Sequence, residues 1–239
     1  MDIEICINSN TAVSQNVLAA YCGGATRIEL CADMAQDGLT PEVAKIEAAR
    51  AAFGKRAGLL VMIRPRGGEF EYSQTEVDLM LAQMEMAHSA GANGVVFGAL
   101  QGEKFHLEQM RRLTERAHQL GLSVTCHRAF DAVANHEEAL HQLINWGVAR
   151  VLTNGTKWGS GLSALDGVGQ LADLMVQAEN RIELVVGGGV GLENVQTVLA
   201  GLPSDVGKVS VHVYSAVLRA GMVSETAVRQ LVQTVQKFQ

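Results

Sequence analysis

The chain has 239 residues, and 48% of them are hydrophobic, which is enough apolar material for one large core or two smaller ones. Lysine and arginine total 19 against 25 aspartates and glutamates, so the net charge is −6 and the pI is near 5.6. This acidic balance leaves no general basic surface to neutralise phosphates, and nucleic acid is not an expected partner.

The amino terminus and the cysteines indicate an aqueous, reducing compartment. Residues 1–4 are not a basic region followed by an apolar run, so no secretory signal is expected. No apolar stretch approaches the ~20 residues that span a bilayer. Cys6, Cys22, Cys31 and Cys126 form no Cys-x-x-Cys pair, which gives a structural zinc site no support. We therefore expect a cytoplasmic protein without a membrane partner.

Short apolar runs alternate with longer segments of helical spacing along the whole chain. The apolar runs predict β-strands near residues 3–7, 26–31, 59–63, 94–98, 122–127, 149–153, 182–187 and 207–212. Helices are expected between them. Ser73 to Glu76 has the spacing of a capping box, Asn135 is another candidate N-cap, and Thr40 before Pro41 predicts a third helix start.

Eight strand–helix units in 239 residues average about 30 residues each, the size of a βα repeat in a closed eight-stranded barrel. An open doubly wound sheet would show the same alternation. In the first two strands, however, Glu4, Cys6, Glu29 and Cys31 alternate with apolar residues, whereas an open parallel sheet is apolar on both faces. We therefore predict an α/β protein with a single (β/α)8 TIM-barrel domain over residues 1–239.

Functional groups of such barrels lie at the carboxyl ends of the strands. After the third expected strand, Arg64 and Arg66 flank a proline that keeps the chain extended, so both guanidinium groups should share one face and bind a carboxylate or phosphate. Alternatively, they pair with interior carboxylates such as Glu4 and Glu29.

A glycine run follows the seventh expected strand. The backbone amides of Gly187, Gly188 and Gly189 are candidates for binding an anion at this place in a barrel. The alternative is that these glycines only permit a tight turn from strand to helix.

His127 is the first candidate for a general acid or base, because it ends the fifth expected strand and Asp131 could orient its ring. Glu29 is a candidate second acid or base. A structural histidine satisfied by a backbone carbonyl is the alternative for His127, and His212, at the end of the last strand, is a weaker candidate.

Cys6 and Cys31 end neighbouring strands, which lie about 5 Å apart in a sheet, so their thiols could share a soft metal ion such as Cu(I) or Zn(II). The stagger of the barrel could instead separate them, leaving two packed thiols. Cys126 has the opposite parity to His127 and should face the helices, and Cys22 should pack within the first helix.

At this point the residues resemble those of the CutC family of copper homeostasis proteins. The matching segments are Glu4–Cys6, Arg27–Cys31, Gly38–Pro41, Ile63–Gly68, Gly94–Gly98, His127–Asp131, Arg150–Thr153, Gly187–Gly189 and His212. Asp37 stands where the family usually has glycine, and Cys126 where it usually has an aromatic residue.

The resemblance implies a cytoplasmic TIM barrel linked to copper handling, which forms a homo-oligomer and binds copper. Its ligands would be Cys6, Cys31 and His127. A second hypothesis is an enzyme that acts on a small anionic or phosphorylated metabolite, with Arg64 and Arg66 holding the charge and His127 moving a proton. A sensor that binds a small ligand in the same pocket is a third.

Overall fold

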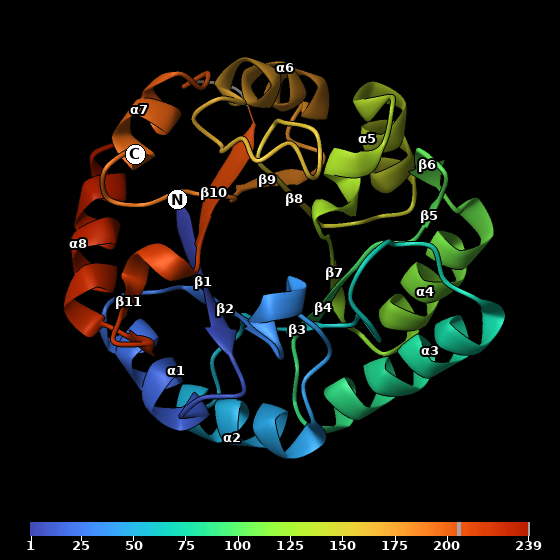
Figure 1. The fold of residues 1–239 in the computed structure, drawn as a ribbon, viewed down its shortest axis with the longest axis horizontal. Helices are drawn as coiled ribbons and strands as arrows, with labels where there is room; N and C mark the ends of the chain where they lie inside the picture. Colours follow the sequence, from blue (N-terminus) through green and yellow to red (C-terminus); the bar gives the residue numbers. More distant parts are fainter. Residues whose placement is uncertain (205–206, 239) are drawn as a thin grey trace.

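Within residues 1–204 and 207–238, which the computed structural model describes, eight parallel strands close into a ring (Figure 1). Their order is β1-β10-β9-β8-β7-β4-β3-β2. The strands are β1 (Asp2–Asn8), β2 (Arg27–Cys31), β3 (Leu59–Met62), β4 (Gly94–Phe97), β7 (Ser123–Cys126), β8 (Arg150–Thr153), β9 (Glu183–Val186) and β10 (Lys208–Val213). The prediction of a (β/α)8 barrel is confirmed, and the open sheet is excluded because β1 pairs with both β2 and β10.

Helices surround this ring (Figure 1). They are α1 (Val13–Cys22), α2 (Val43–Phe53), α3 (Gln74–Ser89), α4 (Leu107–Gln119), α5 (His136–Asn145), α6 (Val168–Ala178), α7 (Val195–Ala200) and α8 (Glu225–Val235). No helix in the described part of the chain is both long and apolar enough to cross a membrane.

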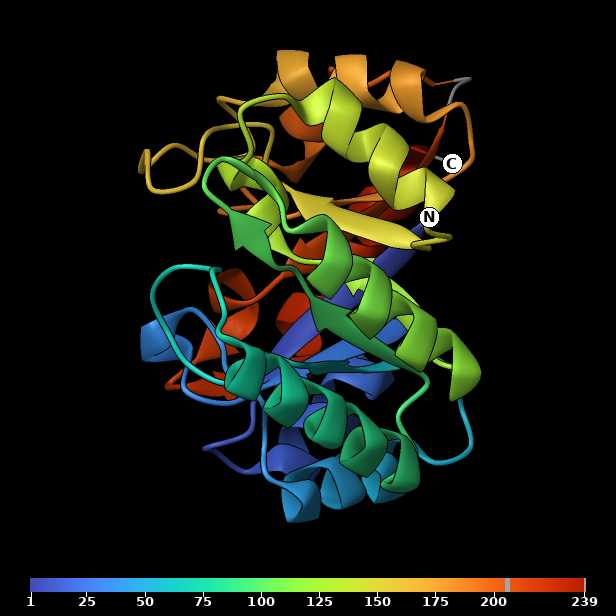
Figure 2. The same cartoon turned by 90° about the vertical axis from the view of Figure 1, so that its right-hand side faces the viewer.

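The loops also contain short β-hairpins and 3₁₀ turns. Two hairpins, β5 (Leu100–Gln101) with β6 (Lys104–Phe105) and β11 (Leu218–Arg219) with β12 (Met222–Val223), pair outside the barrel. The 3₁₀ turns are η1 (Met34–Gln36), η2 (Arg128–Ala132), η3 (Ser215–Val217) and η4 (Gln236–Phe238). In the side view of Figure 2, η1 and the loops 63–73 and 154–167 gather on one side, at the carboxyl ends of the strands.

Two of the three expected helix starts are confirmed. Ser73 and Glu76 form a reciprocal capping box on α3, and the Asn135 side chain accepts from the backbone of Glu138 on α5. The Thr40 prediction was wrong, because α2 begins at Val43 without a side-chain cap. The Thr40 hydroxyl instead accepts a hydrogen bond of 2.8 Å from the backbone N–H of Arg64 and thereby joins the loops after β2 and β3.

The barrel has an apolar layer outside the sheet and a smaller one inside it. The outer layer packs strand residues such as Ile28 and Phe97 against the helices, and it includes Cys126, as its parity predicted. The inner layer consists of Cys6, Cys31, Leu60, Met62 and Val96, with Met34 and Tyr214 packed against it. The two cysteines of interest thus face the barrel axis.

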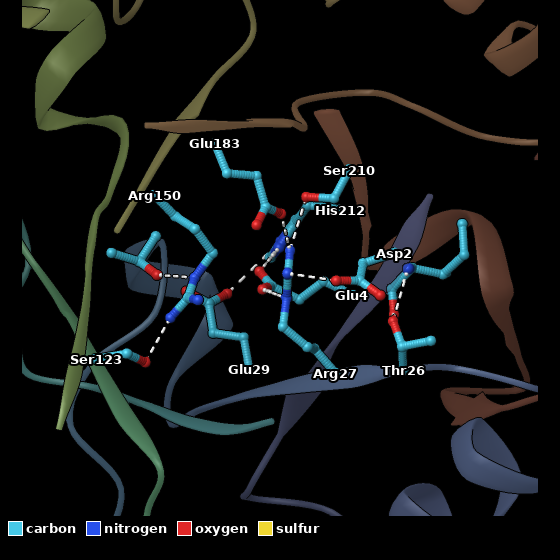
Figure 3. A network of polar contacts seen from close by, with 12 residues as sticks. Asp2, Glu4, Thr26, Arg27, Glu29, Ser123, Arg150, Glu183, Ser210 and His212 are labelled. Carbon is cyan, nitrogen blue, oxygen red and sulfur yellow. Dashed lines mark hydrogen bonds and ion pairs between the residues drawn. The ribbon is translucent and has the colours of Figure 1, made fainter. Parts of the chain in front are cut away.

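Below the inner layer, the barrel holds charged side chains where large aliphatic residues are usual. Arg27 is 7% exposed and lies at the centre of this network (Figure 3). Its guanidinium pairs with Glu4 at 3.0 Å, Glu183 at 2.6 Å and Asp2 at 3.1 Å, and it donates to Ser210. Opposite charges from β1, β2 and β9 therefore compensate one another inside the ring.

Replacing Arg27 with methionine should lower the free energy of unfolding by about 3–5 kcal/mol, because Glu4 and Glu183 would lose their buried counter-charge. Urea denaturation at pH 7 measures this loss. The matched control is Arg229→Met, which breaks an exposed pair with Glu225 and should change stability by less than about 0.5 kcal/mol. A loss below about 1 kcal/mol in Arg27→Met would contradict the prediction that the ion pairs of Arg27 stabilise the folded chain.

Candidate functional site

A cavity of about 520 Å³ opens at the carboxyl ends of the strands, a volume typical of small-ligand sites. It is lined by residues from all around the ring: Cys6, Glu29, Cys31, Met34, Asp37, Met62, Arg64, Phe70, His127, Arg128, Leu152, Trp158, Gly188, Gly189, Val190, Glu193, His212, Tyr214, Ser215 and Ala216. Glu29, Cys31, Arg64 and His127, four of the candidate residues from the sequence, therefore line one cavity.

Three sulfur atoms meet on one wall of the cavity. The Sγ of Cys6 lies 3.8 Å from the Sγ of Cys31 and 3.9 Å from the Sδ of Met34. The strands β1 and β2 are paired neighbours in the barrel, which brings the two cysteines together. In this pairing Cys6 is in register with Glu29, and Cys31 with Asn8. The barrel stagger that could have separated the thiols does not do so.

The loop after β2 turns back to bring Met34 over the cysteines. It does so through left-handed backbone at Asp33 (φ 43°), Asp37 (φ 62°) and Gly38 (φ 87°). The left-handed backbone conformation of Asp37 is strained for a residue with a side chain, whereas glycine would adopt it without strain. A Cβ at Gly38 would lie 3.3 Å from the Sγ of Cys31, so a glycine here leaves room for the thiol.

Beside the sulfurs, His212 lies between two carboxylates (Figure 3). Its Nδ1 is 2.8 Å from Glu4 and its Nε2 is 3.6 Å from Glu29. Burial alone would lower the pKa of His212, but the charge of Glu29 and the contacts with Cys6 and Glu4 outweigh it and raise that pKa well above 6.5. His212 is therefore an imidazolium at neutral pH.

The charges of this cluster follow from its contacts. Burial would raise the pKa of Glu4, but the hydrogen bond and charge of His212, with Arg27, lower it to about 2. The hydrogen bond with Cys31 lowers the pKa of Cys6 to about 6, against the effect of burial, and the same bond raises the pKa of Cys31. Burial and the negative charge of Cys6 raise the pKa of Glu29. Cys6 is thus the thiolate of the cluster.

Two groups in the described part of the chain have metal-ligand spacing: Cys6 with Glu29 and Cys31, and Glu4 with Glu29 and His212. In the second group, both nitrogens of the protonated His212 face carboxylates. His212 therefore forms ion pairs with Glu4 and Glu29 and is not a metal ligand in this state. His127 belongs to neither group, because β7 lies four strands from β1 in the ring, on the opposite side of the cavity.

The surroundings of His127 differ from the expected acid–base pair. Its Nδ1 accepts a 3.1 Å hydrogen bond from the backbone of Ala129, so the neutral ring carries its proton on Nε2. That Nε2 is buried and has no partner among the described residues. Burial, followed by the positive charge of Arg64, lowers the pKa of His127 to about 3. At neutral pH the ring is a hydrogen-bond donor and not a base.

Asp131 does not orient His127, contrary to the expectation. Its carboxylate accepts a 2.7 Å ion-pair bond from Nε of Arg128, a bond from the hydroxyl of Thr153 and a 3.3 Å bond from the backbone of Asn154. The 3₁₀ turn η2 places Arg128 and Asp131 three residues apart on one face, which explains this choice of partner.

Arg64 and Arg66 also do not share one face. Arg64 is 1% exposed, lines the cavity and donates to the backbone carbonyls of Gln36, Gly38 and Gly68. Arg66 does not line the cavity and pairs with Glu76 at 2.6 Å. The capping box at the start of α3 fixes Glu76 within its reach. The alternative prediction, that these arginines pair with interior carboxylates, is also wrong, since Glu4 pairs with Arg27 and His212.

The glycine run after β9 contributes two residues to the cavity wall, Gly188 and Gly189, with φ of 80° and 82°. Gly187 lies beneath them, where a Cβ would be 2.7 Å from Leu152 and 3.2 Å from His212. Both earlier interpretations thus have support: the backbone needs glycine here, and two of the three residues face the cavity.

Sequence reasoning missed Met34, Arg27 and Arg128. Met34 follows Cys31 by three residues, and a sulfur so near a candidate ligand was a usable signal. Arg27 alternates with Glu29 and Cys31 on the interior face of β2, which the two-residue period of a strand could have shown.

The two buried histidines should have opposite charge at pH 7. His212 should be an imidazolium, because two carboxylates hold its proton, whereas His127 should be neutral with its proton on Nε2. Nitrogen-15 NMR of the imidazole rings distinguishes these forms, with His212→Asn and His127→Gln assigning the signals. A neutral His212 at pH 7 would contradict the charge pattern.

The raised pKa of His212 also predicts a pH dependence of stability. A group whose pKa is raised on folding stabilises fully below its unfolded value of 6.5, and the contribution is lost as pH rises through the folded value. The stability difference between the native protein and His212→Asn should therefore shrink above pH 6.5, by at most about 1.4 kcal/mol per pH unit. Urea unfolding from pH 6 to 9 tests this, and a difference that grows with pH would refute it.

Comparison with known proteins identifies the family. The model of the CutC family matches residues 1–214. The family protein CutC of Parabacteroides distasonis is 42% identical over 194 residues, which are 81% of this chain and 75% of that protein. The family protein CutC of Vibrio campbellii is 41% identical over 194 residues, 81% of this chain and 74% of that one.

Solved structures agree with the fold. The putative copper homeostasis protein CutC from Streptococcus agalactiae superposes with a TM-score of 0.77 at 28% identity, over 89% of this chain and 98% of that one. The 3-keto-L-gulonate-6-phosphate decarboxylase of Vibrio cholerae gives a TM-score of 0.65 at 13% identity, over 100% of this chain and 98% of that one, a likeness of fold alone. On the family match and the identity to its relatives, this chain belongs to the CutC family.

Proposed function

We propose that this chain is a cytoplasmic copper homeostasis protein that binds one Cu(I) ion through Cys6, Cys31 and Met34. The observation that carries the proposal is the meeting of three sulfur atoms on one cavity wall, with separations of 3.8 and 3.9 Å from the Sγ of Cys6. The relative from Streptococcus agalactiae, described as a putative copper homeostasis protein, supports the same role.

The donor set suits a soft ion. Thiolate and thioether sulfur select Cu(I) over the harder divalent ions. Metal–thiolate bonds are about 2.3 Å in zinc sites, and an ion at such a distance from both thiols fits sulfurs 3.8 Å apart. Because the pKa of Cys6 is lowered to about 6, this residue already supplies one thiolate at neutral pH. Cys31 would release its proton on binding.

The ligand set differs from the one that the resemblance implied. Met34 replaces His127, whose Nδ1 accepts a backbone hydrogen bond and whose ring lies across the barrel from β1. Assembly into a homo-oligomer stays a prediction. So does the alternative of an enzyme with Glu29, His127 and Asp131 as its acid–base groups, and the separation of Asp131 from His127 does not favour that trio.

Anaerobic titration with Cu(I) against a competing chelator should show one tightly bound ion per chain. Cys6→Ser and Cys31→Ser should each weaken binding by at least about 100-fold, because each removes a thiolate ligand. Met34→Leu should weaken it less, because a thioether is a neutral ligand.

Two other cysteines of the chain are matched controls. Cys22→Ser removes an exposed thiol, and Cys126→Ala removes a buried thiol of the outer layer. Both variants should bind Cu(I) as the native protein does. Failure of the native protein to compete with the chelator, or equal loss in Cys126→Ala and Cys31→Ser, would refute the proposed site.

A further inference from the structure

The cavity wall opposite the sulfur atoms has a different chemistry. The ring order places β7 across from β1 and β8 across from β2. His127 and Arg128 lie on this far wall at the end of β7, and Gly188 and Gly189 adjoin it after β9, two strands along the ring from β7. None of these residues belongs to the proposed copper site, and none has a role in it.

Arg64 gives the cavity a buried positive charge. Among the described residues it forms no ion pair, and its guanidinium donates to backbone carbonyls and lies 5.2 Å from the centre of the Phe70 ring. Carbonyl oxygens accept from its Nη1 and Nη2 but carry no net charge, and its buried Nε has no hydrogen-bond partner among the described residues. An anion in the cavity would be the counter-charge that the protein itself does not provide.

Arg128 is held with part of its guanidinium available. Its Nε donates to Asp131 at 2.7 Å, and its Cζ lies 5.0 Å from the centre of the Trp158 ring, which together fix the plane of the group. Its Nη1 and Nη2 donate to no acceptor in the described part of the chain. A Cβ placed on Gly188 would lie 3.2 Å from Nη1, so this nitrogen sits directly against the glycine loop.

The loop after β9 offers backbone donors beside this arginine. The N–H groups of Gly188 and Gly189 form no hydrogen bond with any described residue, although the carbonyls of both accept one, from Ala164 and Asn194. Consecutive glycine amides of this kind form concave anion sites. The loops after the seventh and eighth strands are also where barrels of this fold most often hold phosphate.

A second observation points independently to a ligand. The Nε2–H of His127 is a buried donor without a partner, and the residue is 4% exposed and lines the cavity. Buried donors are almost always satisfied, so an orphan donor on a cavity wall indicates an acceptor that comes from outside. An oxygen of an anionic ligand would meet this need.

Three acidic side chains also line the cavity: Glu29, which is buried and faces His212 at 3.6 Å, and Asp37 and Glu193. Asp37 and Glu193 are both exposed, so water and salt screen them, whereas the charge of Arg64 is almost completely buried. The charge of Arg64 is therefore screened less than the charges of Asp37 and Glu193.

We propose that the wall formed by Arg128, the amides of Gly188 and Gly189, and His127 binds the phosphate group of a small phosphorylated metabolite, with Arg64 as the buried counter-charge. The cavity volume of about 520 Å³ leaves room for a metabolite of a few carbon atoms beside the phosphate. This binding site is separate from the sulfur atoms and does not depend on copper.

Isothermal titration of the full chain at low ionic strength tests the proposal, with inorganic phosphate and glycerol 3-phosphate as probes and glycerol and acetate for comparison. Both phosphates should bind saturably at one site, and glycerol 3-phosphate should bind more tightly. Arg128→Gln should weaken binding about tenfold or more, as expected for the loss of charge-assisted hydrogen bonds. Arg66→Gln, an arginine outside the cavity, should change it less than twofold.

Because Arg128 also pairs with the buried Asp131, Arg128→Lys serves as a second variant that keeps the charge and should retain intermediate affinity. Cys31→Ser should bind phosphate as the native chain does, which separates this site from the proposed copper site. The proposal is overturned if the native chain binds neither phosphate, if acetate binds as well as phosphate, or if Arg66→Gln loses as much affinity as Arg128→Gln.

Discussion

The double contact of Glu4 is the interaction on which the interior of this barrel depends. One of its oxygens accepts from Arg27 at 3.0 Å and the other faces His212 at 2.8 Å. Burial would otherwise protonate this carboxyl, since a charged group in the interior needs paired and hydrogen-bonded partners. Held as an anion, Glu4 keeps His212 protonated. The charge of His212 in turn favours the thiolate of Cys6, so the ion pairs below the inner layer determine the chemistry of the cavity above it.

The features that were predictable from the sequence are those that depend on near neighbours in the chain. Strand positions followed from short apolar runs, and the capping box of Ser73 and Glu76 from a spacing of three residues. Thr40 failed as an N-cap because its hydroxyl is used by Arg64, a residue on another loop. No local pattern contains that competition, since the two loops meet only when the barrel closes.

The site shows the same division. The contact between Cys6 and Cys31 was predictable because consecutive strands of a barrel are neighbours. Adding His127 to the same site was wrong, because the fifth strand of eight lies opposite the first. That error was avoidable by counting strands. The partners of Arg66 and Asp131 were not predictable, because they depend on the path of the loop before α3 and on the turn η2.

Positive charge beside a proposed copper site would repel the free cation, yet it favours the bound ion once the charges of the ligands are counted. One Cu(I) with two thiolates and a neutral thioether carries a net charge of −1. The imidazolium of His212 contacts this cluster directly, and Arg64 lines the same cavity without forming an ion pair, while Arg66 is turned away toward Glu76. His212 and Arg64 would stabilise an anionic copper–thiolate centre more than an empty pair of thiols, and Arg128 on the far wall, together with Arg64, would attract a phosphate. The same distribution of charge therefore supports both proposed ligands, each on its own side of the barrel.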